Sequence, residues 1–142
     1  AGNEFIIGSD QRALLCRYAS GRRHLDPQDQ LTLEWSGAYA HNHAAMMQTL
    51  IISKACKKHL YMHAVAREAL EACEAAIMPG QPMGDVFAAH AQIFEKAGLG
   101  HARLNACGYA MGAIYNPIWV DFPMFYENNP RLMRERQVFF CI

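Results

Sequence analysis

The chain is predicted to adopt an α+β fold, because its strand patterns and its helical patterns occupy separate stretches of the sequence. Short apolar runs bounded by turn residues come first. A helical period then holds from about residue 57 to residue 97, in two segments separated by Pro79-Gly80. Glycine-rich and aromatic segments follow. This order predicts an antiparallel sheet with two long helices packed on it.

The bulk composition is that of a folded, globular protein. The chain has 142 residues, 52% of them hydrophobic and 18% charged, which suits one domain with a real core. Thirteen basic residues balance thirteen acidic ones, so no net field attracts nucleic acid or an anionic membrane. The five cysteines are scattered and form no C-x-x-C pair, which favours a reducing, cytoplasmic location. No partner among nucleic acids or membranes is therefore expected.

The first strand patterns precede a predicted hairpin. Residues 5–7 and 14–16 are short apolar runs that end at turn residues. Residues 31–38 and 44–52 are expected to pair as an antiparallel hairpin if the chain reverses at Asn42. In that register Glu34 lies across from Ala45 or Met46, and a slip of one residue inverts the faces.

Two helices are predicted next. The first spans residues 57–78, and its apolar stripe is expected to comprise Met62, Ala66, Ala69, Leu70, Cys73 and Ile77. The second carries an apolar face from Met83 to Phe94 that includes His90, which we expect to be a core histidine bonded to a backbone carbonyl. Pro82 stands near its first turn and Gly98 at its end.

The last third of the chain is harder to interpret. Residues 107–115 are predicted to form one or two strands, and residues 138–140 an apolar strand with an unpaired edge. Residues 116–130 are rich in Pro and Asn, which predicts an irregular segment. Within it, Trp119 and Tyr126 are candidates for substrate binding in an apolar pocket, and a dimer contact or a core role are the alternatives.

Three segments in order resemble a known enzyme family. They read LEWSGAYAHNHAAMMQT, MPGQPMGDVF and NACGYAMGA. They are similar to D-x-S-G…H-A-D-x-x-R-T, R-P-G-x-T-x-G-E-V and H-R-x-G-H-x-x-G of peptidase family M24, which includes creatinase, Xaa-Pro aminopeptidase and prolidase. The resemblance implies a truncated pita-bread domain over residues 1–142. The family's N-terminal domain and C-terminal strands are expected to be absent.

The same resemblance implies that most metal ligands are replaced. Working members bind two divalent ions (Mn, Zn, Co or Fe) through two Asp, one His and two Glu. Glu34 falls on the first Asp position, Ala45 on the second and Tyr109 on the His position, while Gln48 replaces an Arg. The two Glu belong to later strands, the first near Ile142. Glu34 is the surviving metal-ligand position, so neither an intact two-metal site nor any cofactor is expected.

Three residues, Glu34, His43 and Tyr109, are predicted to carry the chemistry. Glu34 is a candidate general base or single metal ligand, and a salt-bridged surface Glu is the alternative. His41 and His43 would share a face if both lie on a strand, and with Glu34 opposite they would form an acid–base group or a metal site. Tyr109 would donate a hydrogen bond to a substrate carbonyl, or else be a core tyrosine. Cys107 would be a nucleophile only beside a base.

Two functions follow from the resemblance. The first is an M24-like hydrolase that acts on a C–N or related bond of a small amino-acid-like or peptide-like substrate. The G-Y-x-x-G form at residues 108–112 is similar to non-peptidase branches such as creatinase, which uses His-based chemistry without metal. The alternative is a catalytically inactive homologue that binds a peptide or a protein. A homodimer is expected for the full-length protein, and the fragment alone is expected to be inactive.

Overall fold

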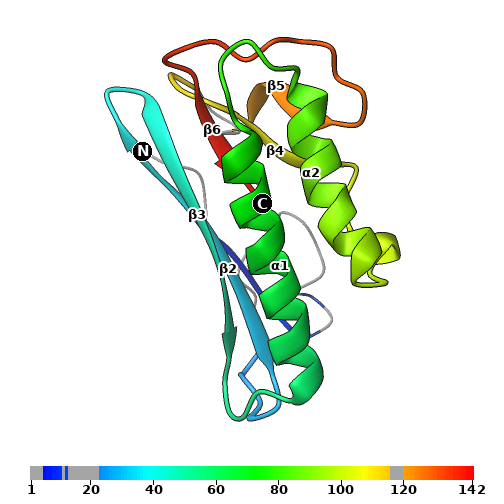
Figure 1. Cartoon of the computed structure of the whole chain (residues 1–142). Helices are drawn as coiled ribbons and strands as arrows, with labels where there is room; N and C mark the ends of the chain where they lie inside the picture. Colours follow the sequence, from blue (N-terminus) through cyan, green and yellow to red (C-terminus); the bar gives the residue numbers. More distant parts are fainter. Residues whose placement is uncertain (1–4, 11, 13–22, 116–119) are drawn as a thin grey trace. The chain divides into compact units, whose positions relative to one another are not determined.

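The computed structural model describes residues 5–10, 12, 23–115 and 120–142, which fall into two compact units (Figure 1). The first unit comprises residues 1–56 and 112–119, and the second comprises residues 57–111 and 120–142. Both contain antiparallel strands, and the second contains the two long helices, as the α+β prediction requires. The predicted strand at residues 14–16 and the candidate Trp119 lie outside the described residues.

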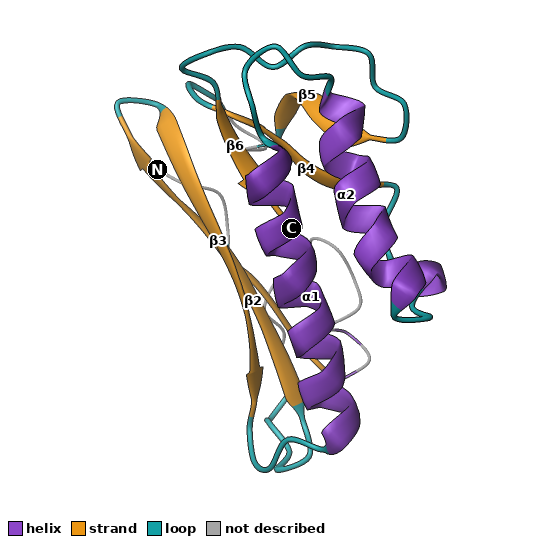
Figure 2. Ribbon diagram, in the orientation of Figure 1, coloured by secondary structure: helices purple, strands orange, loops and turns teal. Residues whose placement is uncertain are grey.

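The first unit is a three-stranded antiparallel sheet of order β1-β2-β3 (Figure 2). Its strands are β1 (Ile6–Ser9), β2 (Gln30–Tyr39) and β3 (Asn42–Ile51). The predicted hairpin is therefore confirmed, and the apolar run at residues 5–7 does begin a strand. In each strand alternate residues face opposite sides of the sheet, so the register decides which side chains share a face.

The hairpin reverses through a two-residue turn at Ala40 and His41. Both residues have positive φ, 49° and 65°, the combination that a type I′ turn needs to match the twist of its strands. Tyr39 pairs with Asn42, so Asn42 opens β3 instead of forming the bend. The prediction that the chain reverses at Asn42 is therefore wrong.

The position of the turn corrects the register of the hairpin. Glu34 pairs with Met47, while Ala45 pairs with Ser36. The predicted partners of Glu34, Ala45 and Met46, are two residues and one residue away from the observed one. The error arises because the two-residue turn leaves Asn42 in the strand. Each residue of β2 therefore pairs with a residue of β3 that lies one or two positions later than predicted.

An ion pair closes the loop that leads into β2. The guanidinium of Arg23 donates to both carboxylate oxygens of Asp29, and it also reaches Ser9 Oγ at 3.1 Å. Asp29 accepts a further bond from the Asp26 amide at 2.7 Å. The Arg23 hydrogen bond and the Asp26 amide hold the pKa of Asp29 below its ordinary value. The start of the strand that carries Glu34 is thus fixed by charge-assisted bonds.

The second unit packs two helices with a second three-stranded antiparallel sheet of order β5-β4-β6 (Figure 2). Its elements are α1 (Lys57–Ala76), α2 (Met83–Lys96), the short 3₁₀ helix η2 (Gly100–Ala102), β4 (Ala106–Met111), β5 (Asp121–Tyr126) and β6 (Val138–Cys141). The core of this unit comprises Cys73, Met83, Val86, Phe87, Cys107, Phe125 and Met133. Both long helices start and end within two residues of their predicted bounds.

Two details differ from the expectation. The buried residues of α1 are Val65, Ala69 and Cys73, whereas Met62 and Leu70 are 38% and 37% exposed. The small side chains of Ala69 and Cys73 allow neighbouring elements to approach closely, so they define the packed face. The segment predicted to be irregular contains β5 despite its proline, because β5 lies at an edge of the sheet, where proline is tolerated.

The N-terminus of α2 is capped by another part of the chain. Pro82 occupies the N-cap and offers no side-chain hydrogen bond. Instead, the amides of Met83 and Gly84 donate to the carbonyls of Arg131 and Asn129 at 2.8 and 2.9 Å. These bonds satisfy two of the amides that a helix start leaves free. The helix therefore needs no capping side chain at this end.

Asn129 and Gly84 make this capping possible. The Asn129 amide donates to the Met124 carbonyl at 2.7 Å, and its oxygen accepts from the Arg131 amide at 3.0 Å, so this buried side chain uses both ends. A Cβ on Gly84 would lie 2.9 Å from the Asn129 backbone nitrogen. The glycine of the G-D-V motif is thus required by a close approach of two backbones.

We predict that Gly84→Ala lowers the free energy of unfolding by about 1–3 kcal/mol, because the added methyl group must push the 128–129 backbone away from the helix. Gly37→Ala is the matched control, since nothing beyond its own chain neighbours lies within 4 Å of the place that its Cβ would take. Urea unfolding of both variants measures the difference. Equal stability of the two variants would contradict the close approach.

Candidate functional site

One face of the β2–β3 hairpin collects the residues that the sequence singles out in the first unit. Ser36 pairs with Ala45, and Ala38 pairs with His43, so these side chains point to the same side as Glu34. Glu34, Ser36, His43 and Ala45 are all buried or half-buried. We call this set the hairpin face.

The hairpin face places position 45 next to Glu34. The two residues are diagonal neighbours across the strand pair, a relation that puts their Cβ atoms roughly 7–8 Å apart. Two carboxylates in this arrangement would be able to hold a cation between them. Ala45 offers a methyl group there, and its direct partner Ser36 offers a hydroxyl, which is a weak ligand when neutral.

His43 is held in a defined tautomer. Its Nδ1 lies 2.9 Å from the His41 carbonyl oxygen, so Nδ1 carries the proton and Nε2 is the acceptor in the neutral ring. Its backbone amide donates to the Gly112 carbonyl at 3.0 Å, and the Ile114 amide donates to the His41 carbonyl at 3.0 Å. The His41 ring also stacks on Tyr115, with 4.6 Å between centroids. Residues 112–115 thus stabilise the turn through these hydrogen bonds and this ring contact.

The predicted group of His41, His43 and Glu34 does not form as expected. His41 lies in the turn, so it does not alternate with His43 along a strand. His43 pairs with Ala38, four residues from Glu34 along β2, a separation of about 13 Å at roughly 3.3 Å per residue. Glu34 and His43 share a face, but they would contact different ends of any ligand that lies on it.

Tyr109 is located in the centre of the second unit's sheet. It lies in β4, pairs with Met124 and Phe140, and is 3% exposed. Its ring packs against Phe140 with 5.4 Å between centroids. Of the two predicted substrate-binding aromatics, Tyr126 is an exposed residue of β5 that pairs with Ala106.

Cys107 sits among thiols and not beside a base. The Cys73 thiol donates to the Cys107 sulfur at 4.0 Å, and both side chains are buried. Burial in this cluster of thiols raises the pKa of the Cys107 thiol. Burial likewise raises the pKa of Cys141 to about 12. A nucleophilic cysteine needs the opposite shift, so Cys107 and Cys141 are core groups.

His90 is a core histidine, as predicted, but its predicted bond to a carbonyl is not seen at Nδ1. The side chain is 5% exposed, and its ring lies 4.7 Å from the Phe94 ring, centroid to centroid. Its Nδ1 is buried and has no hydrogen-bond partner among the described residues. Burial, and secondarily the charge of Arg103, lower the pKa of His90.

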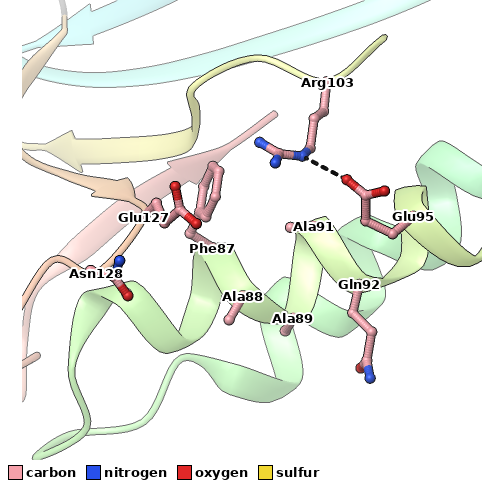
Figure 3. A pocket seen from close by; sticks show the side chains of 10 residues that line it. Phe87, Ala88, Ala89, Ala91, Gln92, Glu95, Arg103, Glu127 and Asn128 are labelled. Carbon is pink, nitrogen blue, oxygen red and sulfur yellow. Dashed lines mark ion pairs between the residues drawn. The ribbon is translucent and has the colours of Figure 1, made fainter. Parts of the chain in front are cut away.

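Sequence patterns gave no indication of a pocket along α2 in the second unit (Figure 3). Arg103, Glu95 and Glu127 converge on it from α2 and from two loops. An isolated arginine in a loop carries no periodic signal, so only the fold reveals its neighbours. Across the described part of the chain, no three His, Cys, Asp or Glu side chains are grouped as metal ligands. None of the helices in that part has the length and apolar character that would let it cross a membrane.

Comparisons with known proteins agree with the folding pattern. The sequence model of metallopeptidase family M24 matches residues 2–141. A comparison with curated protein sequences gives no match.

Solved structures match closely in shape but weakly in sequence. The dipeptidase PepE of Mycobacterium ulcerans superposes with a TM-score of 0.89 at 19% identity, over 98% of this chain and 37% of that one. The prolidase of Pyrococcus furiosus gives 0.87 at 17% identity, over 96% and 39%. The N-terminal domain of SPT16, a FACT complex subunit of chickpea (Cicer arietinum), gives 0.77 at 15% identity, over 95% and 32%. The chain thus spans less than two fifths of these proteins, and the likeness shows the fold alone.

We predict that His90→Phe reduces the loss of stability on acidification. In the folded state the pKa of His90 is lowered, so below the unfolded-state pKa of about 6.5 the unfolded chain takes up a proton that the folded chain does not. The free energy of unfolding is therefore not reduced by His90 above that pKa, and it decreases as pH falls below it. Melting temperatures at about pH 7.5 and about pH 5.5 measure the difference.

The matched control for this prediction is His101→Gln, because His101 is exposed in η2. This variant is expected to keep the acid-dependent loss of the wild type. An equally large loss in His90→Phe would show that other groups cause it.

Proposed function

Because the chain belongs to metallopeptidase family M24, we propose that it is an M24-like hydrolase that works without the family's pair of metal ions. Its substrate would be a small amino-acid-like or peptide-like molecule with a C–N or related bond. The observation that supports this proposal is the pairing of the hairpin, which puts a methyl group at position 45, diagonal to Glu34. The shared fold with prolidases and dipeptidases supports the general class.

The donor chemistry of the hairpin face does not fit two hard cations. M24 enzymes generally depend on a dinuclear metal centre. Mn²⁺ and similar ions take carboxylate oxygens, with imidazole as a further ligand. On the β3 side of Glu34 the register places the Met47 thioether directly opposite and the Ala45 methyl group on the diagonal, and the Ser36 hydroxyl follows on the same face of β2. None of these replaces a carboxylate that bridges two ions, so the proposed reaction has no step through metal.

In the proposed reaction Glu34 acts as a general base. Its carboxylate takes a proton from water, the water oxygen attacks the carbonyl or amidine carbon, and the C–N bond breaks as the nitrogen leaves with a proton. His43 would bind the other end of the substrate through Nε2, its acceptor nitrogen. Tyr109 belongs to the second unit and takes no step in this reaction; its role as a hydrogen-bond donor to a substrate oxygen stays a prediction. These three roles remain predictions from the sequence.

A second candidate is a catalytically inactive homologue that binds a peptide or a protein. The fold match to the N-terminal domain of SPT16, a subunit of the FACT complex, favours it, because that match belongs to a protein that works in an assembly. The replacements at positions 45 and 109 suit both candidates. A measurement of substrate turnover distinguishes the hydrolase from the inactive homologue.

We expect the purified protein to retain well below two ions per chain after dialysis against Mn²⁺ and desalting, as measured by elemental mass spectrometry. Ala45→Asp places a carboxylate diagonal to Glu34 and is expected to raise the retained metal. Ala44→Asp is the matched control, because position 44 pairs with Gly37 and faces the other side of the hairpin. Two ions on the wild type, or equal retention by the two variants, would refute the metal-free proposal.

The catalytic part of the proposal predicts turnover that chelators do not remove. Amine release from a panel of dipeptides, N-acyl amino acids and amidines is measured with and without EDTA. Glu34→Gln is expected to lower the rate by about 10²–10⁴-fold, the usual contribution of a general base. Loss of activity in EDTA would contradict the proposal. Absence of turnover together with a thermal shift on adding a peptide would favour the binding module.

We also propose a cytosolic location. The cysteines in the described part of the chain, Cys56, Cys73, Cys107 and Cys141, are free thiols, which suits a reducing compartment.

A further inference from the structure

The proposed reaction does not use the pocket beside α2, which is lined by charged and apolar side chains. Its volume is about 550 Å³, within the range of roughly 300–1,000 Å³ for small-molecule sites. The residues that matter for its chemistry are Phe87, Ala88, Gln92, Glu95, Arg103 and Glu127. All of them belong to the second unit, whereas Glu34 and His43 belong to the first.

Arg103 is the cationic group of this pocket. Its side chain is 24% exposed, and its guanidinium carbon lies 5.1 Å from the centre of the Phe87 ring. A cation over an aromatic face is held in place by the charge distribution of the ring. The contact with Phe87 therefore restricts the position of the Arg103 side chain.

The donors of Arg103 that a ligand would reach are its two terminal nitrogens (Figure 3). Its Nε lies 3.7 Å from Glu95 Oε1, beyond hydrogen-bond distance, and this buried Nε has no hydrogen-bond partner among the described residues. Figure 3 shows the two terminal nitrogens on the side away from Glu95, above Phe87. A guanidinium in this state presents a planar fork that matches a carboxylate.

Two carboxylates complete the charge pattern. Glu95 approaches Arg103 from α2, and Glu127 lines the pocket from the end of β5, on the Phe87 side of the view in Figure 3. Among the described residues, Arg103 forms its ion pair with Glu95 and not with Glu127. One guanidinium and two carboxylates repel a simple anion, but a molecule with both a carboxylate and an ammonium group meets a partner for each charge.

From this arrangement we propose that the α2 pocket binds a small zwitterion, namely a free α-amino acid with an apolar side chain. The carboxylate of the ligand pairs with the Arg103 fork, its ammonium group pairs with Glu127, and its side chain lies along Phe87 and Ala88. The site shares no residue with the hairpin face. The proposal therefore stands whether or not the chain is a hydrolase.

Three probes test the assignment of charges by isothermal titration calorimetry. L-leucine carries both charges, L-leucinamide lacks the carboxylate, and N-acetyl-L-leucine lacks the ammonium group. L-leucine is expected to bind, and each blocked analogue to bind at least about tenfold more weakly, which corresponds to about 1.4 kcal/mol. Equal binding of all three, or no binding of L-leucine, would overturn the proposal.

Variants locate the site. Arg103→Gln and Glu127→Gln are each expected to weaken L-leucine binding at least about tenfold, because each removes a charged partner. Arg67→Gln is the matched control, since Arg67 is 72% exposed on α1 and does not line the pocket. It is expected to bind as the wild type does.

Two further variants keep the test decisive. Ala88→Trp fills the pocket from an exposed helix position and is expected to abolish binding without removing a charge. Glu34→Gln is expected to leave L-leucine binding unchanged. If Glu34→Gln abolished binding while Arg103→Gln and Ala88→Trp did not, the amino acid would be occupying the hairpin face, and the α2 pocket would be ruled out as its site.

Discussion

The register of the β2–β3 hairpin is the constraint on which the candidate site depends. A two-residue turn with both residues at positive φ fixes Tyr39 against Asn42, and every other pair follows from it. A slip of one residue would send Glu34 to the opposite side from position 45. Two further bonds stabilise this register: the His43 amide at the start of β3 donates to the Gly112 carbonyl, and the His41 carbonyl in the turn accepts from the Ile114 amide.

The fold of the hairpin sets no requirement for a metal-binding side chain at position 45. Strand pairing depends on backbone bonds and on the turn, and neither requires a carboxylate at position 45. An alanine at this position therefore costs the sheet little, while it lacks the oxygen that a hard cation needs. This is a physical reason that a chain can match metallopeptidase folds closely at less than 20% identity.

The second unit depends on a different device, the capping of α2 by the 129–131 backbone. Because Gly84 lets the two backbones approach, the helix needs no side-chain cap, and Asn129 becomes buried with both ends of its amide satisfied. The same loop brings Glu127 to the side of α2. Structural capping and the chemistry of the pocket are thus two results of one packing arrangement.

The sequence by itself determined the α+β layout, both long helices, the hairpin, and the residue types at positions 45 and 109, which the resemblance to the family assigns to its Asp and His positions. These features depend on local periodicity and on residue identity. Only the tertiary structure decided the register, since Ala40-His41 carries no usual signal of a two-residue turn. It also decided the buried face of α1, the strand at Pro123 and the pairing of Arg103 with Phe87. Each of these depends on contacts between segments far apart in the chain, which local patterns do not encode.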